Sequence, residues 1–233
     1  LCLVLLCGCS AKTDSPYVPT GNGLSPDKPE PPKGSAVTEQ KLTLAYNPGH
    51  TLSPFDATDI TNRALFSLLY QGLFAVDEDY VANPILCKSY QASADLKTFT
   101  FYIENATFSD GTPVTIDDVL ASYEAAKDNK NYVGRFTHVR EMAITEDGGI
   151  RFSLATPYEN FPLLLDVPII KAGQEEAEHP IGSGPFIFED SLTGAQLRRN
   201  RAWWCSGSAQ GVVVNAESIP LVAAASTTQI RDE

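Results

Sequence analysis

The chain has 233 residues, of which 43 % are hydrophobic and 20 % are charged, so it is long and apolar enough to bury a substantial core. The formal net charge is −12, which argues against nucleic acid as a partner, because binding to phosphates depends on lysine and arginine. We therefore expect one or two globular domains with an acidic, well-solvated surface.

The first residues are apolar and end in Leu6-Cys-Gly-Cys9. The run over residues 1–6 is shorter than the roughly 20 residues that a membrane-spanning helix needs, so residues 1–9 are interpreted as the end of a signal peptide. Leu6 to Cys9 resembles the lipobox of bacterial lipoproteins. The resemblance implies cleavage before Cys9 and attachment of a lipid to its sulfur; a cysteine-rich signal end that matches by chance is the alternative.

The next stretch, residues 10–37, is rich in proline, serine and glycine and has almost no large apolar residue. Prolines favour extended conformers of about 3 Å per residue, so we predict a disordered tether between a surface and a folded body. A ligand for an SH3-type domain is the alternative. Anchor and tether together predict a location on the outer face of a cytoplasmic membrane, at the cell surface or in the periplasm.

The folded body is predicted to begin with a strand over residues 41–46, in which Leu42, Leu44 and Tyr46 face one side. Residues 47–55 lack periodicity and follow the carboxyl end of that strand, where open α/β sheets place ligands. Asn47 and His50 offer hydrogen-bonding side chains there, and a plain connecting loop is the alternative. A helix is predicted over residues 59–70, with Thr58 as a possible cap and Gly72 as its stop.

The middle of the chain has the clearest local patterns. Phe99, Phe101 and Ile103 alternate with polar residues and predict a strand over residues 98–104, followed by a turn at residues 109–113. Thr115 is a good N-cap for a helix over residues 116–127, with Asp118 in the capping-box position. That position explains Asp117 and Asp118 better than acid/base catalysis does.

The later segments of the chain also predict short strands and a short helix. Residues 142–145 and 149–154 form a hairpin around Glu-Asp-Gly-Gly, which indicates a small sheet between residues 73 and 156. A short helix or irregular packed segment is expected over residues 160–170. Strands are predicted at residues 186–189 and 195–200, and a further strand is possible at residues 211–215. The stretch from Glu217 onward is interpreted as a truncated helix or a frame-disturbed end.

No catalytic or metal site is predicted. His50, His138 and His179 are scattered and have no partner at a spacing typical of zinc ligands or of a nucleophile and its base. The glycine-rich loop at residues 179–186 lacks the lysine and the spacing of a phosphate-binding loop. Cys87 is interpreted as a buried thiol, and a disulfide between Cys87 and Cys205 is the alternative. The sequence thus predicts no enzyme and no cofactor.

Several motifs resemble, in the same order, those of the family 5 extracellular solute-binding proteins, the peptide and nickel receptors of ABC importers. They are Leu52-Ser-Pro-Phe-Asp56, Leu69-Tyr-Gln-Gly-Leu-Phe74, Ala82-Asn-Pro-Ile-Leu-Cys-Lys-Ser-Tyr90, Asp95-Leu-Lys-Thr-Phe-Thr-Phe101, Phe108-Ser-Asp-Gly-Thr-Pro113 with the capped helix that follows, Ile181-Gly-Ser-Gly-Pro-Phe186 and Leu197-Arg-Arg-Asn-Arg-Ala-Trp-Trp204. The departures are Cys87 for alanine, Tyr90 for tryptophan and Ile116 for alanine. The match covers roughly residues 40–205.

The resemblance implies an α/β fold like that of type II periplasmic binding proteins, with the first lobe present and the second lobe missing. It implies a discontinuous core subdomain over residues 38–64 and 175–233, and an extra subdomain over residues 65–174. The expected ligand-binding residues are Asn47, Pro48, Gly49, His50, Leu52, Ser53, Gly182 and Ser183.

The implied function is a lipoprotein that delivers oligopeptides to an ABC importer. The expected partners are an oligopeptide or similar small solute, the ABC permease subunits, and the membrane through lipidated Cys9. The alternatives are an importer-independent peptide-sensing or peptide-binding lipoprotein and a receptor of the same family for nickel or another solute. A surface hydrolase is disfavoured, because no nucleophile constellation is found.

Overall fold

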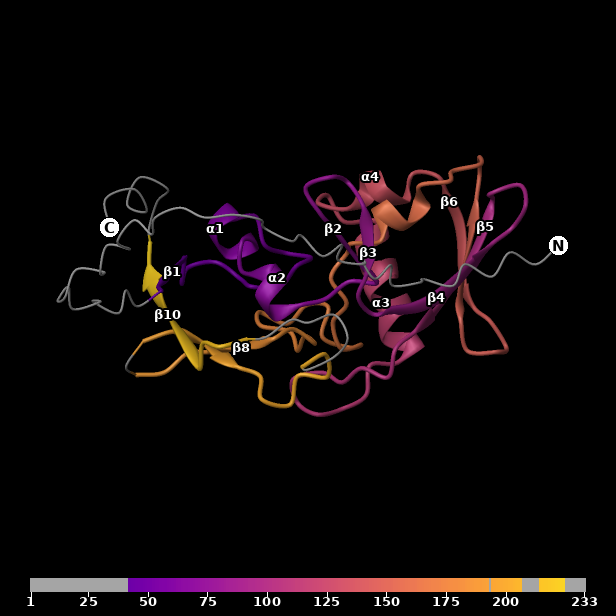
Figure 1. Ribbon diagram of the computed structural model, residues 1–233. Helices are drawn as coiled ribbons and strands as arrows, with labels where there is room; N and C mark the ends of the chain where they lie inside the picture. The colour runs from indigo at the N-terminus through magenta and orange to yellow at the C-terminus, as the bar shows by residue number, and fades with distance from the viewer. Residues whose placement is uncertain (1–41, 193, 207–213, 225–233) are drawn as a thin grey trace, which may run out of the picture. The chain divides into compact units, whose positions relative to one another are not determined.

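The computed structural model describes residues 42–192, 194–206 and 214–224 (Figure 1). All of them belong to one compact unit, Gln40–Glu233. The predicted signal-peptide end, Cys9 and the tether over residues 10–37 lie outside the described residues. No helix within the described residues is long and apolar enough to cross a membrane.

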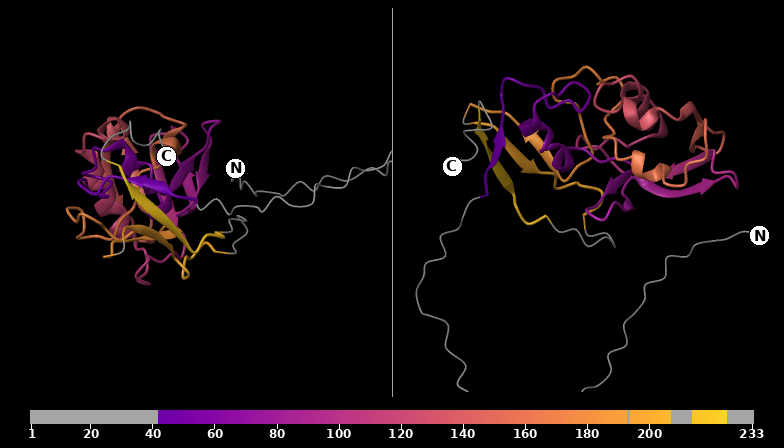
Figure 2. Two further views of the ribbon diagram at one scale, coloured as in Figure 1. Left: turned by 90° about the vertical axis from the view of Figure 1, so that its left-hand side faces the viewer. Right: turned by 90° about the horizontal axis from the view of Figure 1, so that it is seen from above.

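The first four-stranded sheet has the order β1-β10-β9-β8. Its strands are β1 (Leu44–Tyr46), β8 (Phe186–Glu189), β9 (Gln196–Arg199) and β10 (Ser218–Ala223). β1 and β10 run parallel, whereas β10 and β9, and β9 and β8, pair antiparallel. Segments far apart in the sequence therefore lie side by side, as the indigo β1 and the yellow β10 show in Figures 1 and 2.

This sheet corrects two expectations. The strand predicted from residue 41 starts at Leu44, and Leu42 is 61 % exposed instead of packing beside Leu44. The stretch from Glu217 onward contains β10, which the sequence did not predict. β10 carries Pro220 and is held by its neighbours on both sides, so its stability comes from long-range pairing. Residues 214–215 are not in a strand, and residues 211–213 lie outside the described part of the chain.

The single helix predicted over residues 59–70 is wrong. The structure has two short helices, α1 (Ile60–Arg63) and α2 (Phe66–Leu69), and the N-cap of α1 is Asp59 and not Thr58. The break turns Leu65 and Leu69 into the core while Ile60 stays 71 % exposed, an arrangement that one straight apolar stripe does not produce. The C-cap of α2 is Tyr70, so the predicted stop at Gly72 is also wrong. A Cβ atom at Gly72 would lie 2.8 Å from the Val167 carbonyl oxygen, so that glycine permits close packing.

The second four-stranded sheet has the order β4-β5-β7-β6 and confirms the small sheet predicted between residues 73 and 156. Its strands, all antiparallel to their neighbours, are β4 (Cys87–Ala92), β5 (Thr98–Ile103), β6 (Val139–Ile144) and β7 (Ile150–Leu154). A separate hairpin is formed by β2 (Phe74–Val76) and β3 (Ala82–Pro84).

An aromatic core underlies the second sheet. Phe99 and Phe101 of β5 are buried, as their alternation predicts, and they pack with Phe152 and with Phe161. Phe161 begins a 3₁₀ helix, η1 (Phe161–Leu164), which confirms the short helix expected over residues 160–170. Cys87 at the start of β4 is a free, buried thiol, so no disulfide joins it to Cys205. Burial and the nearby Glu104 charge raise the pKa of Cys87 to about 12.

Helix α3 (Ile116–Lys127) has the predicted bounds, and its capping box is formed by Thr115 and Asp118. It packs against β6 and β7 and is followed by α4 (Val133–Phe136). The Asp118 carboxylate also accepts a hydrogen bond from the backbone N–H of Ala172, 2.8 Å away. The helix start is therefore fastened to the chain segment that leads into the glycine-rich loop.

Candidate functional site

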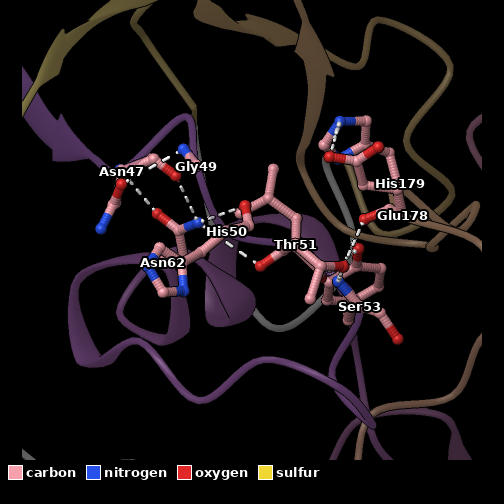
Figure 3. Close-up of polar contacts among 10 residues, drawn as sticks. Asn47, Gly49, His50, Thr51, Ser53, Asn62, Glu178 and His179 are labelled. Atoms are coloured by element: carbon pink, nitrogen blue, oxygen red, sulfur yellow. Dashed lines mark hydrogen bonds and ion pairs between the residues drawn. The ribbon is translucent and has the colours of Figure 1, made fainter.

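The loop after β1 is organised around one buried side chain, Asn62 of α1 (Figure 3). The Asn62 carbonyl oxygen accepts a hydrogen bond from the backbone N–H of Asn47 at 2.8 Å. Its amide nitrogen donates to the backbone carbonyls of Asn47, His50 and Thr51 at 3.0, 2.9 and 3.4 Å. The loop therefore has a defined shape, because a buried amide meets most of its hydrogen-bonding capacity there.

This loop presents Pro48, Gly49 and His50 to solvent. Asn47 is half-buried: its side-chain oxygen accepts from the Gly49 N–H at 3.2 Å, and its amide donates to Asp59 at 3.3 Å. Burial acts to raise the pKa of Asp59, but hydrogen bonds from the residues around it, the Asn47 amide included, outweigh burial and lower that pKa. Four of the predicted site residues thus form one exposed or half-exposed turn next to a carboxylate.

Leu52 and Ser53, by contrast, are fully buried. The Leu52 N–H and the Thr51 hydroxyl both donate to the Glu178 carbonyl, at 3.0 and 2.8 Å, and the Tyr70 hydroxyl donates to the Leu52 carbonyl at 2.9 Å. The loop after β1 is therefore tied to the segment before the glycine-rich loop. The structure brings together two segments that the sequence analysis named separately.

The chain just beyond this loop meets the connection between α3 and α4. The Asn129 amide donates to the Phe55 carbonyl, and the Asn131 amide donates to the Ala57 carbonyl at 3.2 Å. The rings of Phe55 and Tyr132 pack edge to face, 5.9 Å between centroids. Both asparagines use their side chains to hold backbone, which places Tyr132 beside the candidate loop.

Two arginines border Tyr132. Burial raises the pKa of Tyr132, and the charges of Arg63 and Arg135 oppose that rise. Arg135 pairs with Asp166, whereas Arg63 is exposed and has no ion pair among residues 42–192, 194–206 and 214–224. The Tyr132 hydroxyl has no hydrogen bond within the same ranges. A phenol hydroxyl near an unpaired guanidinium can hold a carboxylate.

Sequence reasoning missed Arg63, Tyr132 and Arg135. None of them lies in a motif, and their proximity depends on how α1 and the α3–α4 connection meet in the fold. The asparagines at positions 129 and 131 were the available signal, because side-chain amides in a connection often bind backbone of a neighbouring loop.

The glycine-rich loop is packed tightly against α2. A Cβ atom at Gly182 would lie 2.2 Å from the Leu69 carbonyl oxygen, and one at Gly184 would lie 2.5 Å from the Leu68 carbonyl oxygen. Ser183 between them is fully buried, and its hydroxyl has no hydrogen-bond partner. These glycines permit close contact between two pieces of backbone, and this loop exposes far less to solvent than the loop after β1.

Leu52 and Gly182 nevertheless line the same cavity, which has a volume of about 200 Å³. The cavity lies between the end of α2, strand β8 and the loop that precedes β8. His179 and Ser109 also line this cavity. No group of three or more histidine, cysteine or acidic side chains in the described part of the chain is placed to hold a metal ion.

Comparison with known proteins identifies one family. Residues 82–230 match the family described as bacterial extracellular solute-binding proteins, family 5 Middle. The glutathione-binding protein GsiB of Escherichia coli O1:K1 / APEC is 32 % identical over 172 residues, which covers 67 % of this chain and 34 % of that protein. The chain thus spans about a third of the length of the curated relatives that it matches.

Solved structures share the fold at low sequence identity. NikZ of Campylobacter jejuni in complex with Ni(L-His) has a TM-score of 0.64 at 21 % identity, covering 82 % of this chain and 41 % of its own. NikA of Brucella suis in complex with Fe(III)-EDTA has a TM-score of 0.66 at 21 % identity, with coverages of 81 % and 40 %. The oligopeptide-binding protein AppA of Bacillus subtilis, in complex with a nonapeptide, has a TM-score of 0.58 at 23 % identity, with coverages of 70 % and 37 %.

Proposed function

We propose that this chain, which belongs to the bacterial extracellular solute-binding proteins of family 5, takes part in capturing small peptides outside the cell for an ABC importer. Its fold is the α/β fold of type II periplasmic binding proteins. The observation that carries the proposal is the family match over residues 82–230. Peptides are favoured among the solutes because the relatives at 32 % identity are named for glutathione, which is itself a small peptide.

We propose that the solute is contacted by the turn of Asn47, Pro48, Gly49 and His50, with Leu52, Ser53, Gly182 and Ser183 supporting it. We also propose Arg63 and Tyr132 as candidates for binding a solute carboxylate. This assignment is supported by the exposure of residues 48–50 and by the unpaired charge of Arg63 within the described ranges.

Calorimetric titration of the full-length protein tests the solute. We expect heat with tripeptides and with glutathione, and none with a sugar. Heat with nickel–histidine but none with any peptide would favour the nickel alternative and overturn the peptide proposal.

A matched pair of variants tests the carboxylate contact. Arg63→Ala is expected to weaken peptide binding about tenfold, because a charge-assisted hydrogen bond is lost. Arg140→Ala, which removes an exposed arginine from β6, is expected to leave the affinity unchanged. Equal affinities of the two variants would remove Arg63 from the site.

The importer and the anchor are separate parts of the proposal. Permease and ATPase genes next to this gene would support import, whereas an isolated gene beside a sensor kinase would favour the peptide-sensing alternative. Cys9→Ser is expected to move the protein from the membrane fraction to the soluble fraction. A Cys9→Ser protein that stays with the membrane would overturn lipid attachment at Cys9.

A further inference from the structure

The cavity beneath the glycine-rich loop has walls of two kinds. Most of the residues that line it are apolar, among them Leu52, Leu69 and Phe186, but polar atoms make up almost half of the lining surface, and Tyr70 is also in the wall. Gly182 keeps the loop pressed on α2, because a Cβ atom there would lie 2.4 Å from Tyr70 Cδ1. The cavity is therefore a built feature of the fold and depends on a position where a side chain has no room.

Three backbone groups around the cavity are already hydrogen-bonded. The Leu52 carbonyl accepts from the Tyr70 hydroxyl at 2.9 Å, and the Gly182 carbonyl accepts from the Ser109 N–H at 2.9 Å. The Ile181 N–H donates to the Gln174 side chain at 2.7 Å. These three groups therefore already have partners, and polar side chains in the wall offer a ligand further hydrogen bonds.

Two polar side chains in the cavity wall, those of Ser109 and His179, make no hydrogen bond to another described residue. The Ser109 hydroxyl has no hydrogen bond to any other described residue. The His179 ring lies 4.7 Å from the Phe188 ring, centroid to centroid, and is tilted by 40° to it. The His179 Nε2 atom lies 4.0 Å from a Glu178 oxygen, which is beyond hydrogen-bond distance. One residue that can donate and one that can accept a hydrogen bond are thus among those that line the cavity.

The volume of the cavity and the charges near it limit the kinds of ligand that it can bind. An apolar cavity of about 150 Å³ holds benzene, so a cavity of about 200 Å³ accommodates one ring with a small substituent. The carboxylate of Glu178 precedes His179 in the chain and disfavours an anionic ligand. The apolar walls disfavour an ammonium group, because they would remove its water.

We propose that this cavity binds a phenol-like group, with its ring against the apolar walls and its hydroxyl hydrogen-bonded to Ser109 and His179. A hydroxyl both donates and accepts, as these two side chains require, and aromatic walls favour a ring. The group can belong to a free small phenol or to a tyrosine side chain of the solute. The first source is independent of the proposed function, and the second rests on it.

The test compares p-cresol with toluene, which has the same ring without the hydroxyl, by ligand-observed NMR titration of the full-length protein. We expect p-cresol to bind about tenfold more tightly than toluene, since its hydroxyl gains hydrogen bonds to Ser109 and His179. Equal binding of the two, or no binding of p-cresol, would overturn the proposal. This comparison uses the unaltered protein, so it decides even if a variant fails to fold.

Substitutions of the residues that line the cavity test where p-cresol binds. Ser109→Ala and His179→Phe are each expected to weaken p-cresol binding about three- to tenfold and to leave toluene unaffected. Ser89→Ala on β4 and His138→Phe before β6 are the matched controls, because both residues are exposed and distant in the chain from the cavity wall. Loss of p-cresol binding in the controls but not in the cavity variants would place the site elsewhere and overturn the assignment.

Competition separates the two sources. Displacement of p-cresol by Ala-Tyr-Ala but not by Ala-Ala-Ala supports a side-chain pocket for the solute, and no displacement by either peptide supports a free phenol. Calorimetry with Ala-Ala-Ala reports on peptide binding by itself. Its failure would concern the proposed function, whereas failure of p-cresol would concern this cavity alone.

Discussion

The sheet β4-β5-β7-β6 and the loop after β1 are stabilised by different kinds of interaction. The sheet buries a cluster of stacked and edge-to-face rings centred on Phe101, which has no exposed surface. The turn at residues 47–50 in the loop has no buried side chain, and the shape of the loop depends on hydrogen bonds from Asn62 and to the Glu178 carbonyl. The sheet should therefore respond to lost apolar volume, and the loop to the loss of single polar atoms.

The largest effect is expected in the sheet. Phe101→Ala should lower the free energy of unfolding by about 3–5 kcal/mol, because it removes a buried ring and leaves a cavity. Gln91→Ala, on the exposed outer face of β4, should change it by less than about 0.5 kcal/mol. Urea unfolding at 25 °C measures both. A cost below about 1 kcal/mol for Phe101→Ala would contradict an aromatic core as the main support of this sheet.

Close packing of the glycine-rich loop gives the next effect. Gly182→Ala should cost about 3 kcal/mol, because the new methyl group would lie 2.2 Å from the Leu69 carbonyl oxygen and backbone would have to move. Gly134→Ala in α4 is the control: nothing lies within 4 Å of its added Cβ, and alanine there should stabilise by up to about 1 kcal/mol. Similar unfolding midpoints for the two variants would contradict the tight contact between this loop and α2.

Asn62→Ala tests the loop directly. The variant should lose about 2–3 kcal/mol, because several backbone groups of residues 47–51 lose their partner in a buried place. Asn83→Ala, which removes an exposed amide of β3, should cost less than about 1 kcal/mol. Urea unfolding measures the difference. If Asn62→Ala were as stable as Asn83→Ala, the loop would not depend on its buried amide.

The same contrast explains what the sequence could predict. The alternation around Phe101, the capping box of Thr115 and the hairpin before β7 are local patterns, and the structure confirms them. β10 is stabilised by pairing with segments distant in the chain, and it contains Pro220, which is atypical of a strand, so its local sequence does not indicate a strand. The helix predicted over residues 59–70 is interrupted, because tertiary contacts outweigh the local helical pattern there. The Asn62 side chain binds the loop after β1 instead of facing solvent.

The candidate site divides in the same way. The turn at residues 47–50 could be named because loops after strand ends are typical ligand sites. The proximity of Arg63 to Tyr132 could not be named, since it depends on contacts between residues 55–57 and the α3–α4 connection, which are far apart in the sequence. The cavity shared by Leu52 and Gly182 is likewise visible only after folding.

Helix capping gives a smaller effect. Thr115→Ala should cost about 1 kcal/mol, because the Asp118 N–H loses its acceptor and the capping box is broken. Thr43→Ala, an exposed position before β1, should change stability by less than about 0.5 kcal/mol. Thermal unfolding followed by circular dichroism measures both. Equal melting temperatures would show that tertiary packing alone stabilises the start of α3.

The smallest effect is expected from an ion pair between the turn at residues 109–113 and the segment before the glycine-rich loop. Asp110 and Lys171 lie 2.7 Å apart. Burial acts to raise the pKa of Asp110, but hydrogen bonds from Lys171 and Thr112 outweigh it and lower the pKa to about 2. A carboxyl group whose pKa is lower in the folded state contributes stability above its unfolded pKa, and this contribution is lost as the pH falls towards the folded pKa.

Lys171→Met should therefore be less stable than the parent at pH 6, and the difference should shrink between about pH 5 and pH 2 as Asp110 is protonated. Lys127→Met, which removes the exposed partner of Glu124, should show a small difference at pH 6, because exposed pairs contribute little. Urea midpoints measured from pH 2 to pH 6 give both profiles. A Lys171→Met difference that stays constant over this range would mean that the lysine stabilises through the packing of its methylene groups and not through the charge of Asp110.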